Sequence, residues 1–291
     1  MNTIILKRNN YLNPEFPELF NMIRELERFL DEPVDPTNET WLANLEAIIR
    51  FQDEDGSFKL LDSYRVESDA RVDFCHVPNY LCTAILMKAF LTDRNLIAGL
   101  GRTGLHSALR TCCHREFRGH GYEAFDGQLQ ALAIFMKGGV REFLSCYEEL
   151  CPEFTEMFRK IAAELRDPGH LNDSYAERVA EIDHYFSHRN VFVYGTLMAG
   201  ERNHHFLSES KPEGRAILHG YDKIDLGSYP GAVPGEGSVE GELYEVDLDT
   251  LHRLDLLEGE GDLYLRKCAP VVTEDGQTVF ALFYEYRRPQ P

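Results

Sequence analysis

Residues 191–200 read VFVYGTLMAG, a short apolar run that stops at a glycine turn, and residues 254–259 read LDLLEG. The first stretch has the β-branched and aromatic composition of a buried strand that leads into a turn. The second ends an amphipathic helix and carries a carboxylate, Glu258, where an apolar residue is expected. Together they predict a backbone-lined pocket that faces one sheltered acid, which suits acid–base chemistry on a small amide.

The composition of the chain is that of a soluble globular protein, with 291 residues, 43% hydrophobic and 27% charged, enough for two domains. A net charge of −19 argues against nucleic acid or an anionic membrane surface as partner, because both require basic patches. The N-terminus lacks a signal-peptide pattern, and no apolar run approaches the ~20 residues of a membrane span. The seven cysteines are an odd number and favour reduced thiols. A cytoplasmic location is expected.

The spacing of apolar residues changes near residue 189. Residues 1–170 predict an all-α domain, residues 171–188 a connector helix, and residues 189–291 a small α+β domain with a barrel-like sheet. The expected helices of the first part are at about 16–30, 38–51, 78–92, 97–113, 126–137, 139–150 and 152–166, and that of the connector at 174–187. The expected strands are 190–195, 215–221, 238–247, 263–273 and 278–287, with one helix at 249–258.

Two stretches of the helical part echo each other. Residues 44–58 and 106–125 both run from a helix through a polar turn and a glycine to a phenylalanine. Repeated helical hairpins of this kind predict an α/α hairpin array or a partial α/α toroid. The phrase FQDEDGSF at residues 51–58 resembles the helix-ending signature of terpenoid-cyclase-type α/α repeats.

The position of Glu258 in its helix points to a role in proton transfer. It follows Leu251 by seven residues and Leu254 by four, so it lies on the face that carries the buried leucine stripe, to which Leu248 and Leu257 also belong. Partial desolvation there raises the pKa of a carboxylic acid, as a general base working near neutral pH requires. From spacing alone, a solvated glutamate at a frayed helix end is the alternative.

The glycine turn offers a complementary surface. Gly195 directly after a strand permits a tight turn, and its missing side chain lets a ligand approach the backbone. The amides that follow it are able to bind a carboxylate or a developing oxyanion. Taken alone, this motif also fits an ordinary turn between a strand and a loop.

Residues 190–288 resemble the γ-glutamylcyclotransferase-like superfamily, and most closely its γ-glutamylamine cyclotransferase branch. VYGTL at 193–197 is similar to the signature loop, VEGELYEVD at 239–247 to the strand before the helix, and LDLLE at 254–258 to the helix end that bears the catalytic acid. The motifs Asn203-His204, Tyr229-Pro230, Pro234-Gly235 and Tyr264-Leu265-Arg266 follow at fitting distances. Met198 stands where that branch is usually more basic, which leaves the preferred leaving group open.

The resemblance implies a γ-glutamylcyclotransferase-like small β-barrel that cyclises a γ-glutamyl amide and releases 5-oxoproline with a free amine or amino acid. It implies neither a metal nor an organic cofactor. Glu258 is the implied catalytic acid and base. The implied substrate-binding residues are Tyr194, Gly195, Thr196 and Leu197, and Tyr264 and Tyr284 are candidates for lining the pocket, with core or cross-strand packing as the alternative for each tyrosine.

A second reading is a non-catalytic module that binds a γ-glutamyl or similar small acid and is coupled to a helical domain that docks a protein partner. Cysteines and histidines also gather loosely between residues 75 and 120, at Cys75, His76, Cys82, Cys112, Cys113, His114 and His120. Their spacing matches no familiar metal finger, so buried structural thiols are favoured over metal ligation.

Overall fold

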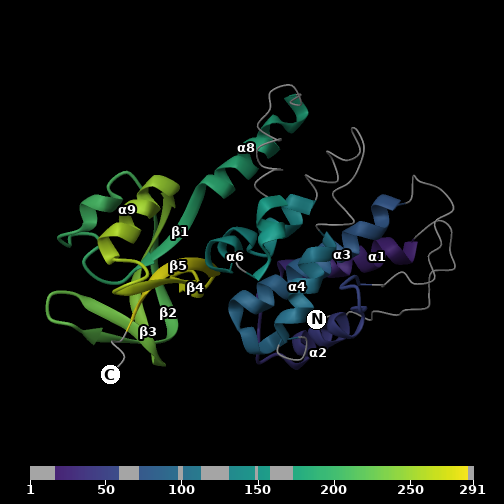
Figure 1. Ribbon diagram of the computed structural model, residues 1–291, viewed down its shortest axis with the longest axis horizontal. Helices are drawn as coiled ribbons and strands as arrows, with labels where there is room; N and C mark the ends of the chain where they lie inside the picture. Colours follow the sequence, from purple (N-terminus) through teal and green to yellow (C-terminus); the bar gives the residue numbers. More distant parts are fainter. Residues whose placement is uncertain are drawn as a thin grey trace. The chain divides into compact units, whose positions relative to one another are not determined.

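The computed structural model describes residues 17–58, 72–97, 101–112, 131–147, 150–157 and 173–287 (Figure 1). The chain splits into two compact units. One contains Met1–Val140 and Tyr147–Ala176, and the other contains Arg141–Cys146 and Glu177–Pro291. Within the described ranges, no helix is long and apolar enough to cross a membrane. The six residues Arg141–Cys146, which the sequence assigns to the helical domain, therefore group with the C-terminal unit.

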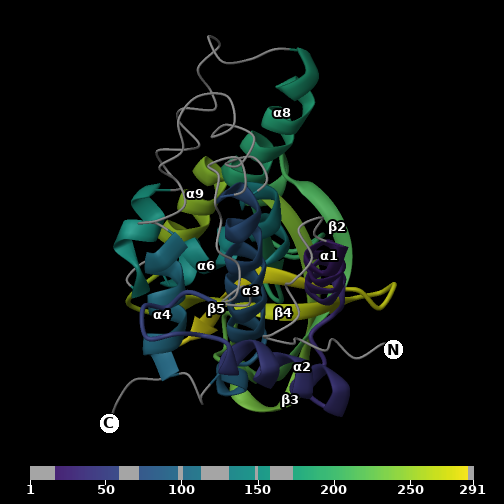
Figure 2. The same cartoon turned by 90° about the vertical axis from the view of Figure 1, so that its right-hand side faces the viewer.

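The first unit is helical. Its helices are α1 (Pro17–Asp31), α2 (Glu39–Arg50), α3 (Val72–Thr92) and α4 (Gly101–Thr111), with a short 3-10 helix, η2 (Arg94–Ile97), after α3. Residues 131–137 and 152–157 are also helical. Figure 2 shows α3 between α1 and α4, and it contacts both. Almost every residue from Val77 to Leu91 is buried, so α3 is the central helix of this unit and packs into its core on every side.

A lysine of α3 is tied to the end of α1. The Lys88 ammonium donates to the carbonyl oxygens of Leu30 at 2.6 Å and Glu32 at 2.8 Å. The last carbonyls of a helix have no partner within it and carry its negative dipole end, so a cation there stabilises the helix. Burial lowers the pKa of Lys88 from its ordinary value. The contact fixes α1 against α3.

The expected start of the third helix after Pro78 is wrong. α3 begins at Val72, and Pro78 lies inside it. A proline in a helix interior costs about 3 kcal/mol because it lacks an N–H donor and crowds the preceding turn. Burial of the surrounding apolar residues offsets that cost. The turn expected after α2 is confirmed, with Gly56 at φ 86°, whereas residues 113–125 of the second echo lie outside the described residues. The α/α toroid therefore stays a prediction.

The second unit is a closed barrel, as expected for the C-terminal part. Its strands are β1 (His188–Val193), β2 (Lys211–Asp225), β3 (Pro230–Asp247), β4 (Tyr264–Thr273) and β5 (Thr278–Tyr286), in the spatial order β1-β3-β2-β4-β5. Neighbours in this order pair antiparallel, and β1 closes the barrel by pairing in parallel with β5 at Val191 and Leu282. The long strands β2 and β3 continue past bulges near Gly214 and Tyr221.

Helices enter and cover this barrel at defined points. α8 (Asp173–Ser187) leads directly into β1, and α9 (Leu248–Glu258) connects β3 to β4. α9 contacts β1, β3 and the short 3-10 helix η6 (His204–Leu207). α6 (Val140–Tyr147) supplies the six residues that join this unit. The interior is filled by alternate residues of all five strands, among them Phe192, Leu218, Leu243, Val271 and Phe283. This closed core gives the site a rigid floor.

Candidate active site

Glu258 is the last residue of α9. Asp247 caps the start of the helix by accepting from the Thr250 amide at 2.7 Å, and Gly259 ends it in the left-handed region at φ 60°. Leu251 and Leu254 are buried beneath the helix. The two caps fix both ends of the helix, so Glu258 is its last residue.

The leucine stripe is narrower than the sequence suggests. Leu248 is 47% exposed because it stands at the first position of α9, before the helix turns onto the barrel. Leu257 is only half-buried. Glu258 is itself half-buried, so its expected place on the inward face holds.

The turn after β1 is held from several sides. The Met198 amide donates to the Gly195 carbonyl at 3.0 Å, which closes a turn over residues 195–198. The Asn203 amide donates to the Thr196 carbonyl at 2.9 Å, and the Asn203 side chain donates to the Thr196 hydroxyl at 3.0 Å. In the described part of the chain, the amide N–H groups of Thr196 and Leu197 donate to no backbone or side-chain acceptor. They are thus available to an anion.

Gly195 is required for a reason that the sequence did not show. A Cβ atom at this position would lie 2.5 Å from Cγ of Pro230, at the start of β3. The φ angle is not in the left-handed region, so close packing against the proline ring selects the glycine, rather than backbone strain. The turn is thereby pressed against β3.

Three buried tyrosines line the pocket alongside the turn and the acid, and together they form a tyrosine wall. The Tyr194 hydroxyl donates to the Tyr284 carbonyl and accepts from the Ala232 amide at 3.1 Å. The Tyr264 hydroxyl donates to the Pro230 carbonyl at 2.7 Å, and the Tyr284 hydroxyl donates to the Asp255 carboxylate at 2.8 Å. Burial raises the pKa of each of these tyrosines. Their hydroxyls are engaged inside the protein, so the rings shape the pocket.

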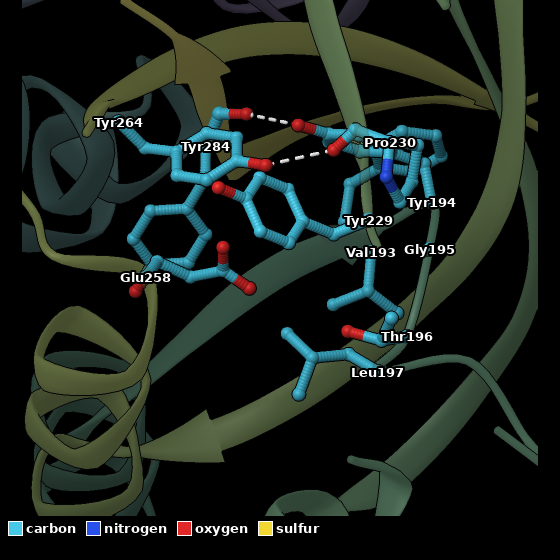
Figure 3. A pocket seen from close by; sticks show the side chains of 11 residues that line it. Val193, Tyr194, Gly195, Thr196, Leu197, Tyr229, Pro230, Glu258, Tyr264 and Tyr284 are labelled. Atoms are coloured by element: carbon cyan, nitrogen blue, oxygen red, sulfur yellow. Dashed lines mark hydrogen bonds between the residues drawn. The ribbon is translucent and has the colours of Figure 1, made fainter. Parts of the chain in front are cut away.

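The structure brings every residue proposed from the sequence into one pocket (Figure 3). Its lining consists of Phe192, Val193, Tyr194, Gly195, Thr196, Leu197, Tyr229, Pro230, Glu258, Tyr264 and Tyr284. The free space is small, about 30 Å³. A ligand of several atoms therefore requires a rim side chain to move, and Tyr229 is 37% exposed at its edge. Phe192, Val193, Tyr229 and Pro230 were not proposed as site residues, although Tyr229-Pro230 was noted as a motif.

Glu258 has an unusual electrostatic position in this pocket. Its carboxylate points from α9 toward the turn (Figure 3). Across the residues that the structure describes, no hydrogen bond or ion pair reaches this carboxylate. Burial alone raises its pKa to about 7. The ionisable groups whose titration it influences are Tyr194, Tyr264 and Tyr284, which stay neutral near pH 7. Such an acid is poised to accept and return a proton near neutral pH.

The cysteine and histidine residues between 75 and 120 fall mostly outside the residues whose side chains are described. Cys82 and Cys112 are described, and both side chains are fully buried in the helical unit. The Cys112 sulfur lies 3.5 Å from the Thr83 hydroxyl. In the part of the chain with described side chains, no three His, Cys, Asp or Glu residues are arranged to hold a metal ion.

Comparisons with known proteins place the C-terminal region in a known family. The family model described as gamma-glutamyl cyclotransferase, AIG2-like, matches residues 191–291. The chain is 39% identical over 99 residues to the gamma-glutamylcyclotransferase family protein ytfP of Citrobacter rodentium, and the match covers 34% of this chain and 82% of that protein. The chain belongs to the gamma-glutamylcyclotransferase family through this C-terminal region.

Two solved structures are each similar to about a third of the chain. The solution structure of ytfP from Escherichia coli is 39% identical and covers 34% of this chain and 84% of that chain, with a TM-score of 0.28. The crystal structure of an AIG2-like protein from Mus musculus is 28% identical and covers 36% of this chain and 81% of that chain, with a TM-score of 0.33.

Proposed function

We propose that the barrel unit cyclises a γ-glutamyl amide into 5-oxoproline and releases a free amine or amino acid. One observation carries the proposal. An unpartnered, half-buried carboxylic acid, with its pKa raised to about 7, faces a turn in which the Thr196 and Leu197 amides have no acceptor in the described residues. An acid and an anion-binding backbone on opposite sides of one pocket are what an intramolecular attack by an amine on an amide requires.

The turn would bind the glutamyl end of the substrate. The Thr196 and Leu197 amides would donate hydrogen bonds to the α-carboxylate, and the close packing of Gly195 on Pro230 keeps them in place. The chain of the glutamyl group then folds back along the tyrosine wall, which brings its α-amine against its own γ-carbonyl carbon. Positioning of this kind replaces a bimolecular attack by an intramolecular one and lowers the barrier by several kcal/mol, roughly 7–11 in the best cases.

Glu258 would move the one proton of the reaction. The ionised carboxylate removes a proton from the α-amine as the nitrogen forms its bond to the γ-carbonyl carbon. When the bond between that carbon and the leaving nitrogen breaks, the protonated Glu258 returns the proton to the leaving amine. No water and no further reactant is consumed, and the acid ends in its starting state. The tyrosine wall keeps water from hydrolysing the amide instead.

The experiment uses the full chain and a panel of γ-glutamyl amines and γ-glutamyl dipeptides, with 5-oxoproline measured by mass spectrometry. Wild type is expected to release 5-oxoproline and amine in equal amounts. Glu258→Gln is expected to lower kcat by about 10²–10⁴, the contribution of a general base, while calorimetry still detects substrate binding. Glu274→Gln removes an exposed carboxylate in the turn between β4 and β5 and serves as the charge-matched control.

Two results would contradict the proposal. One is a wild-type protein that binds γ-glutamyl compounds and never forms 5-oxoproline, which supports the binding-module alternative. The other is a Glu258→Gln protein with wild-type turnover, which places the proton transfer elsewhere.

A further inference from the structure

The Asp255 carboxylate joins three elements of the barrel unit. It lies one helical turn before Glu258 on α9, and its Oδ1 atom accepts the Tyr284 hydroxyl of β5 at 2.8 Å. Its Oδ2 atom pairs with the Arg266 guanidinium of β4. The Asp255 and Arg266 side chains are only 21% and 23% exposed, so the ion pair is screened less than one on an open surface. The end of α9 is therefore tied to two strands.

The backbone of Asp255 secures the same turn of helix. Its carbonyl oxygen accepts the amide of the capping residue Gly259 and the amide of Glu260, the latter at 2.9 Å. Glu258 immediately precedes these two donors. Its backbone is thus fixed by the side chain of one residue, Asp255, and by the turn that closes on the carbonyl of that residue.

Tyr284 connects this arrangement to the other side of the pocket. Its hydroxyl donates to Asp255 on the side of the acid, and its carbonyl accepts the Tyr194 hydroxyl on the side of the glycine turn. The Tyr194 hydroxyl in turn accepts the Ala232 amide of β3. A single residue of β5 therefore sets the separation between α9 and the turn.

We propose that Asp255, Arg266 and Tyr284 form a clamp that positions Glu258 opposite the Thr196–Leu197 amides. The proposal rests on the proposed function and assigns these three as positioning residues, which act through Glu258. It gives Tyr284 a role different from direct substrate contact, because its hydroxyl is already committed to Asp255. The clamp keeps α9 pressed on the barrel, so the acid stays among the tyrosine rings and away from bulk water.

Loosening the clamp is expected to expose Glu258, because the burial of its carboxylate depends on where α9 lies. No side chain in the described residues forms a hydrogen bond with the Glu258 carboxylate, so only the placement of α9 limits its exposure to water. Its titratable neighbours Tyr194, Tyr264 and Tyr284 are neutral and supply no compensating charge. When the clamp is loosened, water reaches the carboxylate and the acid moves away from the reacting nitrogen. A displacement of about 1 Å costs up to about 10² in rate.

The test is Tyr284→Phe, which removes one hydroxyl and keeps the ring. The matched control is Tyr221→Phe, which removes a tyrosine–carboxylate hydrogen bond of 3.1 Å, to Glu285, in the same barrel and outside the pocket lining. We expect kcat of Tyr284→Phe to fall about 10- to 100-fold with KM changed less than about threefold. Tyr221→Phe is expected to keep the wild-type kcat.

A second readout does not depend on turnover. The full chain is labelled with ¹³C at glutamate carboxyls, the Glu258 signal is assigned from its loss in Glu258→Gln, and its titration is followed by NMR. In Tyr284→Phe the pKa of this carboxyl is expected to move from about 7 toward the ordinary glutamate value of 4.5. Asp255→Asn keeps an acceptor for Tyr284 and loses the ion pair with Arg266, so it is expected to give a smaller shift in the same direction.

The outcomes separate this proposal from the proposed function. If wild type forms no 5-oxoproline, the proposed function fails, and the titration alone decides the clamp. An unchanged Glu258 pKa in Tyr284→Phe overturns the clamp. The clamp is also overturned if kcat and melting temperature fall to the same degree in Tyr284→Phe and Tyr221→Phe, since that is a structural role only.

Discussion

Lys88 in the helical unit and Glu258 in the barrel unit are both ionisable side chains withdrawn from water, and their surroundings differ. The Lys88 ammonium reaches two carbonyl oxygens at the end of α1, at 2.6 and 2.8 Å. Within the described residues, the Glu258 carboxylate has no hydrogen-bonding partner, and burial raises its pKa to about 7. The Lys88 ammonium is engaged in hydrogen bonds that join α3 to the end of α1, whereas the Glu258 carboxylate remains available to a ligand.

This difference teaches where to look for function. A buried charge that is fully partnered contributes to stability, while an unpartnered one in a pocket is a cost that folding alone does not explain. The helical unit shows abundant core packing in its described residues, whereas the pocket that holds Glu258 is formed by residues of the barrel unit. The chemistry is therefore expected to reside in the barrel unit.

The largest expected effect comes from comparing one tightly packed glycine in each unit. Gly195→Ala places a methyl group 2.5 Å from the Pro230 ring, and Gly138→Ala places one 2.8 Å from the Ala84 carbonyl. Gly195→Ala must displace the turn that we propose binds the substrate carboxylate, so kcat/KM for a γ-glutamyl amide is expected to fall about 100-fold. Gly138→Ala is expected to cost about 1–3 kcal/mol of stability and to leave turnover per folded molecule unchanged.

Trp41 makes the stability of the helical unit easy to follow. It is the single tryptophan of the chain, and it is buried against Phe29 with ring centroids 5.1 Å apart. Urea denaturation monitored by its fluorescence therefore reports on that unit. Equal losses of turnover in the two glycine variants would break the proposed division between the units.

The next-largest effect on stability is expected from replacing Lys88, and it contrasts with that of replacing Glu258. Lys88→Met leaves two carbonyl oxygens of the α1 terminus without their donor, so the helical unit is expected to lose about 2–3 kcal/mol in the tryptophan-monitored denaturation. Glu258→Gln is expected to act in the opposite direction at pH 8, because it removes a desolvated charge. Hydrogen exchange of the barrel amides measures that gain.

The pH dependence of the Glu258→Gln comparison has a defined sign. The folded-state pKa of Glu258, about 7, lies above the ordinary value of 4.5, so the folded protein binds this proton more tightly than the unfolded chain. The stability that this proton provides is fully present below pH 4.5 and is lost as the pH rises through 7. The gain from Glu258→Gln is thus expected to grow by about 3 kcal/mol between pH 4.5 and 8. A gain that does not vary with pH would contradict the shifted pKa.

The smallest effect compares two helix caps. Asn38 accepts the Thr40 and Trp41 amides at the start of α2, and Asp247 accepts the Thr250 amide at the start of α9. Alanine at either position is expected to cost about 1 kcal/mol in the unit concerned. Only Asp247→Ala is expected to reduce turnover, by several-fold, because α9 carries Glu258. A turnover defect in Asn38→Ala would show that the helical unit contributes to the chemistry.

The barrel and its pocket were largely accessible from the sequence because their signals are local. Alternating β-branched and aromatic residues mark the strands, and the spacing of the leucines that precede Glu258 marks the helix that it ends. The glycine after β1 marks the turn. The family resemblance then joined segments that lie about sixty residues apart.

The remaining features depend on contacts between distant residues. The Asp255, Arg266 and Tyr284 clamp joins three elements, and neither its hydrogen bond nor its ion pair follows from any local pattern. The packing of Pro230 on Gly195 is likewise a tertiary contact. Pro78 misled the helix assignment because a local breaker was overridden by burial around α3. The roles of the proposed site residues stay predictions until they are tested by experiment.

The most direct test of the central claim is a crystal structure of the full chain with 5-oxoproline bound. The account predicts that the product carboxylate lies on the Thr196 and Leu197 amides and that a Glu258 carboxylate oxygen lies within about 3 Å of the ring nitrogen, the hydrogen-bonding range for a general base. A product bound at another surface, or one bound in this pocket with Glu258 turned into solvent, would contradict it.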